Sequence, residues 1–164
     1  AFAREMGDFD SLDAFTKVVR EDLAASAVRD ADAAARTQLL DEIVGANPFE
    51  IPPSWVKQMV QAYAQAYKIP QEELGKFGEE IRGMAERQVR RDLILDTVAE
   101  REKLTATEAD VDEKVAEMAG KRGMEPGPLY ASLQKAGRLR ELERSITEER
   151  VFAWLLGKNT IEQA

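Results

Sequence analysis

The chain has 164 residues, of which 44% are hydrophobic and 33% are charged, a balance that predicts one soluble folded domain. It contains no cysteine and no histidine, which excludes a disulfide framework, thiol and histidine catalysis, and nearly all structural zinc sites. The formal net charge of -8 makes nucleic acid and anionic membrane surfaces unfavourable partners.

The sequence also gives no sign of a membrane or secretion signal. No stretch approaches the roughly 18 consecutive apolar residues of a membrane span, and the first residues lack the basic and apolar regions of a signal peptide. We therefore expect a cytoplasmic protein with no membrane partner. The sequence begins at Ala1 rather than at an initiator methionine, which is consistent with excision from a longer protein.

A single long helix is predicted over 11–44, where neither glycine nor proline occurs. Ser11 is a favourable N-cap, and Asp13 places a negative charge at the positive end of the helix dipole. This helix would be roughly 50 Å long, whereas a compact domain of this size has a radius of gyration of about 15 Å. We therefore expect an elongated molecule. The larger apolar side chains recur at helical spacing: Leu12, Phe15, Val19, Leu23, Leu39 and Ile43.

A helical hairpin is predicted over 51–104, after a connector rich in proline. Its first helix, 54–67, is expected to begin with Ser54 as the N-cap. Its second helix, 71–104, is weakened in its first half by three glycines. Apolar residues follow helical stripes in both limbs: Trp55, Met59, Ala62, Tyr63 and Ala66 in the first, and Leu74, Phe77, Ile81, Met84, Val89, Leu93, Ile94 and Val98 in the second.

The remaining part of the chain, 105–164, is predicted to form a second arm and a closing helix. Thr105 and Glu108 have the spacing of a capping box for a helix that reaches Gly120. Two more helices are expected, over 129–136 and over 138–156 with Gly157 closing the latter.

No alternating run of β-branched residues predicts a strand. The expected fold class is therefore all-α, an elongated multi-helix domain with a long backbone helix and protruding helical-hairpin arms. One domain is expected over 1–164, divided into the lead and long helix (1–50), the first arm (51–104) and the second arm with the closing helix (105–164).

Several patterns resemble chemical sites but fit structural roles better. The acidic residues Asp8, Asp10 and Asp13 lack the glycine and the terminal glutamate of a calcium loop. The glycine-containing segments 75–78 and 120–123 follow no predicted strand, as a phosphate loop requires. Adjacent glutamates on a helix point in different directions, so they do not form an acid and base pair. We therefore expect no metal, no cofactor and no catalytic residue.

One stretch is locally basic. Its arginines fit surface ion pairs with neighbouring carboxylates better than a contact with ribosomal RNA or an acidic client. The basic residues are Arg82, Arg87, Arg90 and Arg91, and the nearby acidic ones are Glu79, Glu86 and Asp92.

Five segments occur in an order and at separations that are typical of one family. They are the long helix ending near Val44; the connector Asn47-Pro48-Phe49-Glu50-Ile51-Pro52 leading into Trp55-Val56; the stretch Gln88-Val89-Arg90-Arg91-Asp92-Leu93-Ile94-Leu95; Glu102-Lys103-Leu104 followed by Thr107-Glu108-Ala109-Asp110-Val111; and the run Glu148-Glu149-Arg150-Val151-Phe152-Ala153-Trp154-Leu155-Leu156. Together they cover nearly the whole chain. They resemble the C-terminal domain of trigger factor, the ribosome-associated bacterial chaperone.

The resemblance implies an all-helical body with two arms that holds unfolded or nascent polypeptides without ATP. The family's ribosome-docking signature, Phe-Arg-x-Gly-Lys, does not occur in the sequence. No β-rich stretch corresponds to the family's prolyl isomerase domain. We therefore expect no isomerase activity, and contact with the ribosome only through an N-terminal domain outside this sequence.

Six side chains are predicted to contact unfolded clients, because methionine and aromatic side chains adapt to varied apolar surfaces. The same helical spacing is also typical of a buried core. The six are Met59, Tyr63, Tyr67, Phe77, Met84 and Tyr130. The alternative function is a helical adaptor or self-association domain, including a homodimer, that binds one defined protein. A sustained heptad stripe would favour that alternative, and the alanine-rich middle of the long helix does not provide one.

Overall fold

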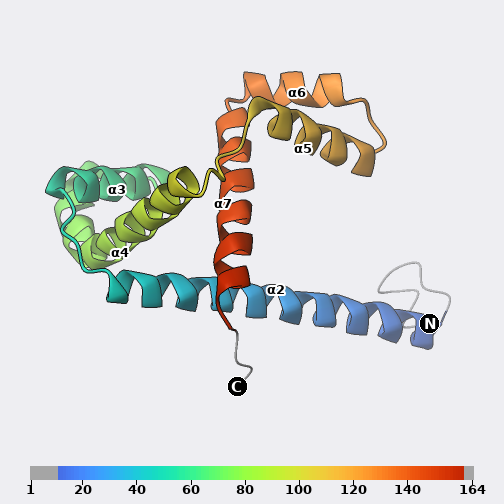
Figure 1. Cartoon of the computed structure of the whole chain (residues 1–164), viewed down its shortest axis with the longest axis horizontal. Helices are drawn as coiled ribbons and strands as arrows, with labels where there is room; N and C mark the ends of the chain where they lie inside the picture. Colours follow the sequence, from blue (N-terminus) through green and yellow to red (C-terminus); the bar gives the residue numbers. More distant parts are fainter. Residues whose placement is uncertain (1–10, 161–164) are drawn as a thin grey trace. The chain divides into compact units, whose positions relative to one another are not determined.

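The computed structural model describes residues 11–160, and the chain divides into two compact units, Ala1–Ile43 and Val44–Ala164. Within the described range there are six α-helices and one short 3-10 helix, and no strand is present there (Figure 1). The predicted all-α fold class is confirmed.

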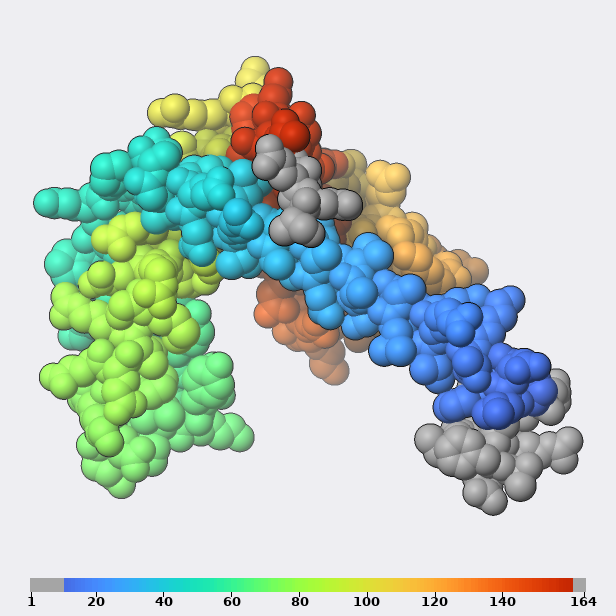
Figure 2. Space-filling view, turned by 90° about the horizontal axis from the view of Figure 1, so that it is seen from below, coloured from blue at the N-terminus to red at the C-terminus, as the bar shows by residue number. Residues whose placement is uncertain are grey.

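The long helix α2 spans Leu12–Ala46, close to its predicted range. The Ala14 amide donates to the Ser11 hydroxyl at 3.1 Å, which confirms Ser11 as the residue that caps its start. Gly45 is the last residue but one of this helix. The side chains of α2 form one continuous rod, coloured blue to cyan in Figure 2. Much of its apolar surface is open to solvent, including Leu23 and Val28.

The first hairpin consists of α3 (Pro53–Ala66) and α4 (Leu74–Arg101), and it confirms the predicted pairing. A turn with Lys68 in the left-handed region and the 3-10 helix η1 (Gln71–Glu73) connect the two limbs. The predicted cap Ser54 is wrong. Pro52 occupies the N-cap position instead, because the fixed φ of the following proline suits the first turn of a helix.

The second hairpin consists of α5 (Glu108–Lys121) and α6 (Pro126–Lys135). Its predicted capping box is wrong by two residues. Thr107 and Asp110, not Thr105 and Glu108, form the box. The reason is a contact between residues far apart in sequence. The Ala106 amide donates to the Thr147 hydroxyl at 2.9 Å, and this hydrogen bond holds Ala106 outside the helix.

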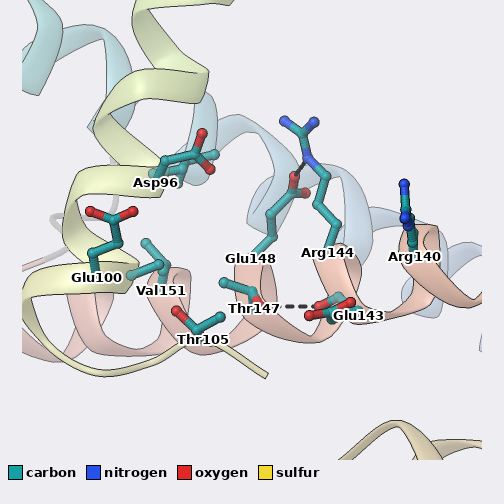
Figure 3. Close-up of a pocket in the computed structure, with 11 residues that line it drawn as sticks. Asp96, Glu100, Thr105, Arg140, Glu143, Arg144, Thr147, Glu148 and Val151 are labelled. Atoms are coloured by element: carbon teal, nitrogen blue, oxygen red, sulfur yellow. Dashed lines mark hydrogen bonds and ion pairs between the residues drawn. The ribbon is translucent and has the colours of Figure 1, made fainter. Parts of the chain in front are cut away.

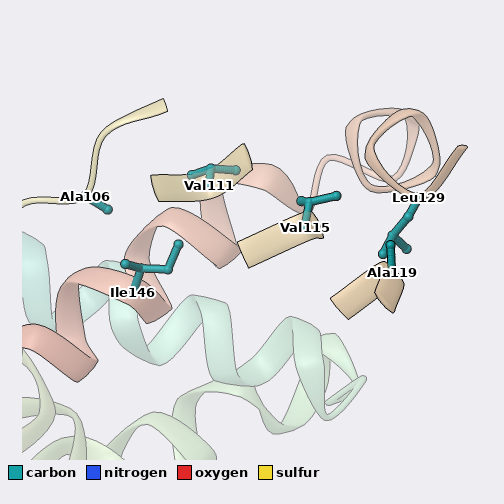
Figure 4. Packing of buried hydrophobic residues seen from close by; sticks show 6 residues of the cluster. All are labelled: Ala106, Val111, Val115, Ala119, Leu129 and Ile146. Carbon is teal, nitrogen blue, oxygen red and sulfur yellow. The ribbon is translucent and has the colours of Figure 1, made fainter. Parts of the chain in front are cut away.

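The last helix, α7, spans Leu139–Lys158 and packs against both hairpins (Figure 1). Gly157 was expected to close it, but the helix continues to Lys158, and the Asn159 side-chain amide donates to the Leu155 carbonyl at 2.6 Å. Buried side chains from α5, α6, α7 and the connector before α5 form one apolar cluster (Figure 4). Its members are Ala106, Val111, Val115, Ala119, Leu129 and Ile146.

An ion pair joins the start of α5 to α7. Arg150 donates from both terminal nitrogens to the Asp110 carboxylate, with Nη1 at 2.9 Å from Oδ2. The Thr107 amide and hydroxyl donate to the same Oδ2 at 2.7 and 2.8 Å. These hydrogen bonds, first from Arg150 and then from Thr107, hold the pKa of Asp110 well below its ordinary value of 3.8. One carboxylate therefore both caps α5 and fixes it to α7.

Asp110→Asn is expected to lower the free energy of unfolding at neutral pH and to have little effect in strong acid. A carboxyl group whose folded-state pKa is depressed contributes stability that is complete above its unfolded pKa and lost as pH falls through the folded pKa. The difference between wild type and variant should therefore be constant above about pH 5 and shrink below about pH 4. Urea denaturation of both proteins across this range measures it. A difference that stays constant into acid would contradict this assignment.

Candidate functional site

Helix α3 carries apolar side chains on two faces, and only one of them is packed against α4. Val56 and Ala64 are buried, and between them the Val60 methyl Cγ1 lies 3.4 Å from the place of a side chain on Gly78. At about 100° per residue, Trp55 and Met59 project from a different face. The sequence stripe through Trp55 is therefore the one that α4 leaves uncovered.

The uncovered face of α3 borders a groove of about 330 Å³. Its walls come from α3, α4 and one residue of α7. Trp55 keeps 44% of its surface exposed, and Met59 is half-buried. The lining residues are Trp55, Gln58, Met59, Ala62, Val89, Asp92, Leu93, Asp96 and Arg144. The groove is thus mainly apolar along α3, with charged groups where α4 meets α7.

A second cleft, of about 380 Å³, lies between α4 and α7 (Figure 3). Asp96 and Arg144 line both the groove and this cleft. Arg144 donates from Nε to Glu148 at 2.8 Å and lies 3.1 Å from Asp92 on α4. The hydrogen bond to Glu148 is the main cause that raises the pKa of Arg144. This arginine therefore joins α4 to α7 at the boundary between the two hollows.

Asp96 lies in an unfavourable environment for a charged carboxylate. Loss of hydration raises its pKa above 3.8; Arg144 opposes this effect, while Asp92, Glu100 and Glu148 add to it by repulsion. The side chain is nevertheless exposed to solvent, so the effect on stability is screened.

Asp96→Asn is therefore expected to stabilise the protein slightly at neutral pH. A carboxyl group whose folded-state pKa is raised lowers stability as pH increases through the window between its unfolded and folded pKa. The advantage of the variant should be complete above that window and vanish below about pH 3.8, where both residues are neutral. Urea denaturation at neutral and acidic pH measures this, and an asparagine variant less stable at neutral pH would contradict it.

The predicted client contacts on α3 lie in two places. Met59 lines the groove beside Trp55. Tyr63 and Tyr67 stack on each other, with ring centroids 6.4 Å apart and planes inclined by 20°. Tyr67 is 67% exposed, and Tyr63 is half-buried. The end of α3 therefore presents an aromatic pair whose outer member is open to solvent.

The predicted contacts on α4 lie on another face. Phe77 and Met84 are two turns apart and so share a face, whereas Met84 and Leu93 are separated by about two and a half turns. Leu93 borders the groove, so Met84 projects from the opposite side of the helix. Tyr130, on α6, packs against the apolar cluster of the second hairpin. The structure therefore does not bring the six residues into one site.

Trp55, Val89 and Leu93 line the groove, but they were not among the six predicted contacts. All three stood in the predicted apolar stripes. Trp55 carried a signal that could have been used. A helix that packs on one side needs only one apolar stripe, so a large aromatic side chain beside an already apolar face indicates a second, uncovered face.

The acidic and basic patterns of the sequence lie only partly within the described residues. No group of three or more carboxylate side chains within residues 11–160 is arranged to hold a metal ion. The predicted cluster with Asp8 and Asp10 lies outside the described residues. In the basic stretch, Arg82 donates to Glu86 at 3.2 Å, as expected, whereas Asp92 pairs with Arg144. None of the helices in the described part is long and apolar enough to cross a membrane.

Comparison with known proteins supports the resemblance found in the sequence. The family model described as "Bacterial trigger factor protein (TF) C-terminus" matches residues 11–157. Trigger factor of Geobacter sulfurreducens is 29% identical over 99% of this chain and 40% of its own length. Trigger factors of Anaeromyxobacter dehalogenans and Lysinibacillus sphaericus are 27% and 29% identical, over 99% and 94% of this chain and 41% and 39% of their own lengths.

The chain thus spans about two fifths of the length of the curated relatives it matches. For three of these relatives, it covers 41%, 40% and 38% of their length. No solved structure is significantly similar to it. The match over nearly the whole chain agrees with the order of the helices, from the long α2 through the two hairpins to α7. The chain belongs to the family of bacterial trigger factor C-terminal domains.

Proposed function

We propose that this chain is an ATP-independent chaperone domain that binds unfolded or nascent polypeptides through separate apolar patches. The observation that carries the proposal is the second apolar face of α3, which borders an open groove with Trp55 exposed by 44%. A helix that presents large apolar side chains to solvent beside a groove is typical of a binding surface. The proposed setting is the cytoplasm.

The proposed principal contacts are Trp55, Met59 and Leu93 in the groove. The stacked tyrosines at the end of α3 and the face of α4 with Phe77 and Met84 are proposed as separate secondary contacts. Tyr130 would provide a further contact on the second hairpin. Because these patches lie on different faces, we infer that one extended client reaches several of them in turn.

The expected affinity is modest. A client that buries about 500 Å² of apolar surface gains roughly 12 kcal/mol, and most of this is offset by the loss of translational freedom and by ordering of the client. Fast exchange follows from such a balance, and it would let a client leave and fold without an energy source. No bond is made or broken in this function.

We place any contact with the ribosome outside these 164 residues. The net charge of -8 opposes binding to ribosomal RNA. The docking signature expected for the family is also absent from the printed sequence.

A residue-resolved NMR titration with two unrelated unfolded proteins and one folded control tests the proposal. We expect both unfolded proteins, and not the folded one, to shift the resonances of Trp55, Met59 and Leu93. Binding to only one of the unfolded proteins would favour the adaptor function instead. No shift with any of the three would contradict client binding by this chain.

A further inference from the structure

The two halves of α4 differ in how firmly they are held. Its buried side chains all lie in the second part of the helix, from Ala85 to Ala99. In the first part, Leu74, Phe77 and Ile81 are only half-buried. Since burial of apolar surface provides most of the stability of a helix in a protein, the first part has less tertiary support than the second.

The same part of α4 contains three glycines that the backbone does not require. Gly75, Gly78 and Gly83 all have helical φ values, since none is among the positive-φ glycines. A side-chain carbon on Gly75 would meet no atom within 4 Å, and one on Gly83 would meet only the mobile end of Arg87 at 3.9 Å. Alanine would therefore fit, and it would favour the helix about fivefold over an interior glycine.

The start of α4 lacks a side-chain cap, and the 3-10 helix η1 runs directly into it. Glu73 occupies the N-cap position, and no side-chain cap hydrogen bond is formed there. Two exposed ion pairs support the segment, with Lys76 at 3.8 Å from Glu80 and Arg82 at 3.2 Å from Glu86. Exposed pairs of this kind contribute little. Residues 74–83 thus combine three features: few buried side chains, glycines that the backbone does not require, and a helix start without a side-chain cap.

We propose that residues 74–83 open by local unfolding while the rest of the first hairpin stays folded, and that the open form binds an apolar segment of an unfolded polypeptide. The proposal rests on the chaperone function proposed above and deepens it. Opening uncovers Val60 on α3, which faces Gly78 in the closed helix. It also frees Leu74, Phe77 and Ile81 to contact the client.

The charges of the segment define the client that it fits. Lys76 and Arg82 balance Glu79 and Glu80, so the open segment selects apolar residues without selecting charge. When no client is present, the helix re-forms and covers its own apolar side chains. Opening and binding are then linked equilibria, in which a client shifts the population toward the open form.

Hydrogen exchange of the full chain, without client, tests the opening. In wild type, the amides of 74–83 should exchange faster than those of 85–101. Gly75→Ala combined with Gly83→Ala should slow exchange of 74–83 about 25-fold, because each substitution contributes about fivefold. Gly157→Ala is the matched control, because a side chain there also meets no atom within 4 Å but lies in α7. Equal exchange in the two halves of wild-type α4 would overturn the proposal.

The affinity for an unfolded client, measured by fluorescence anisotropy, tests whether the client binds the open form of 74–83. If the client binds the open form, Gly75→Ala with Gly83→Ala should raise the apparent Kd about 25-fold, and Gly157→Ala should not change it. Slowed exchange with an unchanged Kd would overturn the proposal while the chaperone function stands. Absence of client binding by wild type would overturn both the chaperone function and the claim that the open segment binds a client. The exchange measurement would then still decide whether the segment opens.

Discussion

Trp55→Ala combined with Met59→Ala is expected to weaken binding of an unfolded client by about 20- to 30-fold, or roughly 2 kcal/mol. Both side chains line the groove between α3 and α4. An aromatic side chain offers about 150 to 250 Å² of contact area, and it loses little flexibility on binding. The apparent Kd for two unrelated unfolded proteins, measured by fluorescence anisotropy, checks the result.

The control for this variant is Met124→Ala. Met124 is 41% exposed, close to the exposure of Trp55, but it lies between α5 and α6 and borders no part of the groove. Its removal should leave client affinity unchanged. Trp55 is 44% exposed and Met59 is half-buried, so the groove variant should lose some stability but remain folded in the absence of urea. If the control and the groove variant weaken binding equally, the groove is not the principal contact.

The helices of this protein could be predicted from sequence because their signals are local. The run without glycine or proline gives α2, and the proline and glycine breaks give the two hairpins. The errors lie at helix ends. Thr105 and Glu108 have the spacing of a capping box. Thr107 and Asp110 have the same spacing, with aspartate in place of glutamate, and the local sequence does not decide which pair caps the helix. The structure separates them through Thr147, which binds the Ala106 amide from 41 residues away.

The candidate site was less predictable than the fold, for a related reason. Periodicity identifies an apolar face on a helix but not what covers it. On α3 two faces are apolar, and the packing of Val60 beside Gly78 determines which one is covered by α4. On α4, one continuous stripe was predicted, but Met84 and Leu93 project in opposite directions. The pairing of Arg144 with Asp92 likewise joins residues far apart in sequence.

These long-range contacts give α7 a central role in the unit formed by Val44–Ala164. Arg144 joins α7 to α4, and Arg150 joins it to α5. Val151 is fully buried on the same helix and lines the cleft between α4 and α7. For the proposed patches to act separately, the two hairpins would have to keep defined positions without burying them. We infer that α7 performs this task by supporting each hairpin on a different part of its surface.

Ile146→Ala is expected to lower the free energy of unfolding by about 3 kcal/mol. Ile146 is buried and belongs to the apolar cluster with Val115 and Leu129, so its truncation leaves a cavity where α7 meets the second hairpin. This loss is a large part of a total stability of about 5 to 15 kcal/mol. The midpoint of urea denaturation, with the slope compared to wild type, measures it.

Ile146→Val provides the graded control and should cost only about 1 kcal/mol, because it removes one methyl group rather than most of the side chain. The damage should also be local. Hydrogen exchange should increase in α5 and α6, where the cluster is lost, and remain unchanged in α3, whose buried residues Val56 and Ala64 lie outside the cluster. Client binding through Trp55 and Met59 should then persist. An alanine variant that loses no more stability than the valine variant would show that α7 does not hold the second hairpin through this contact.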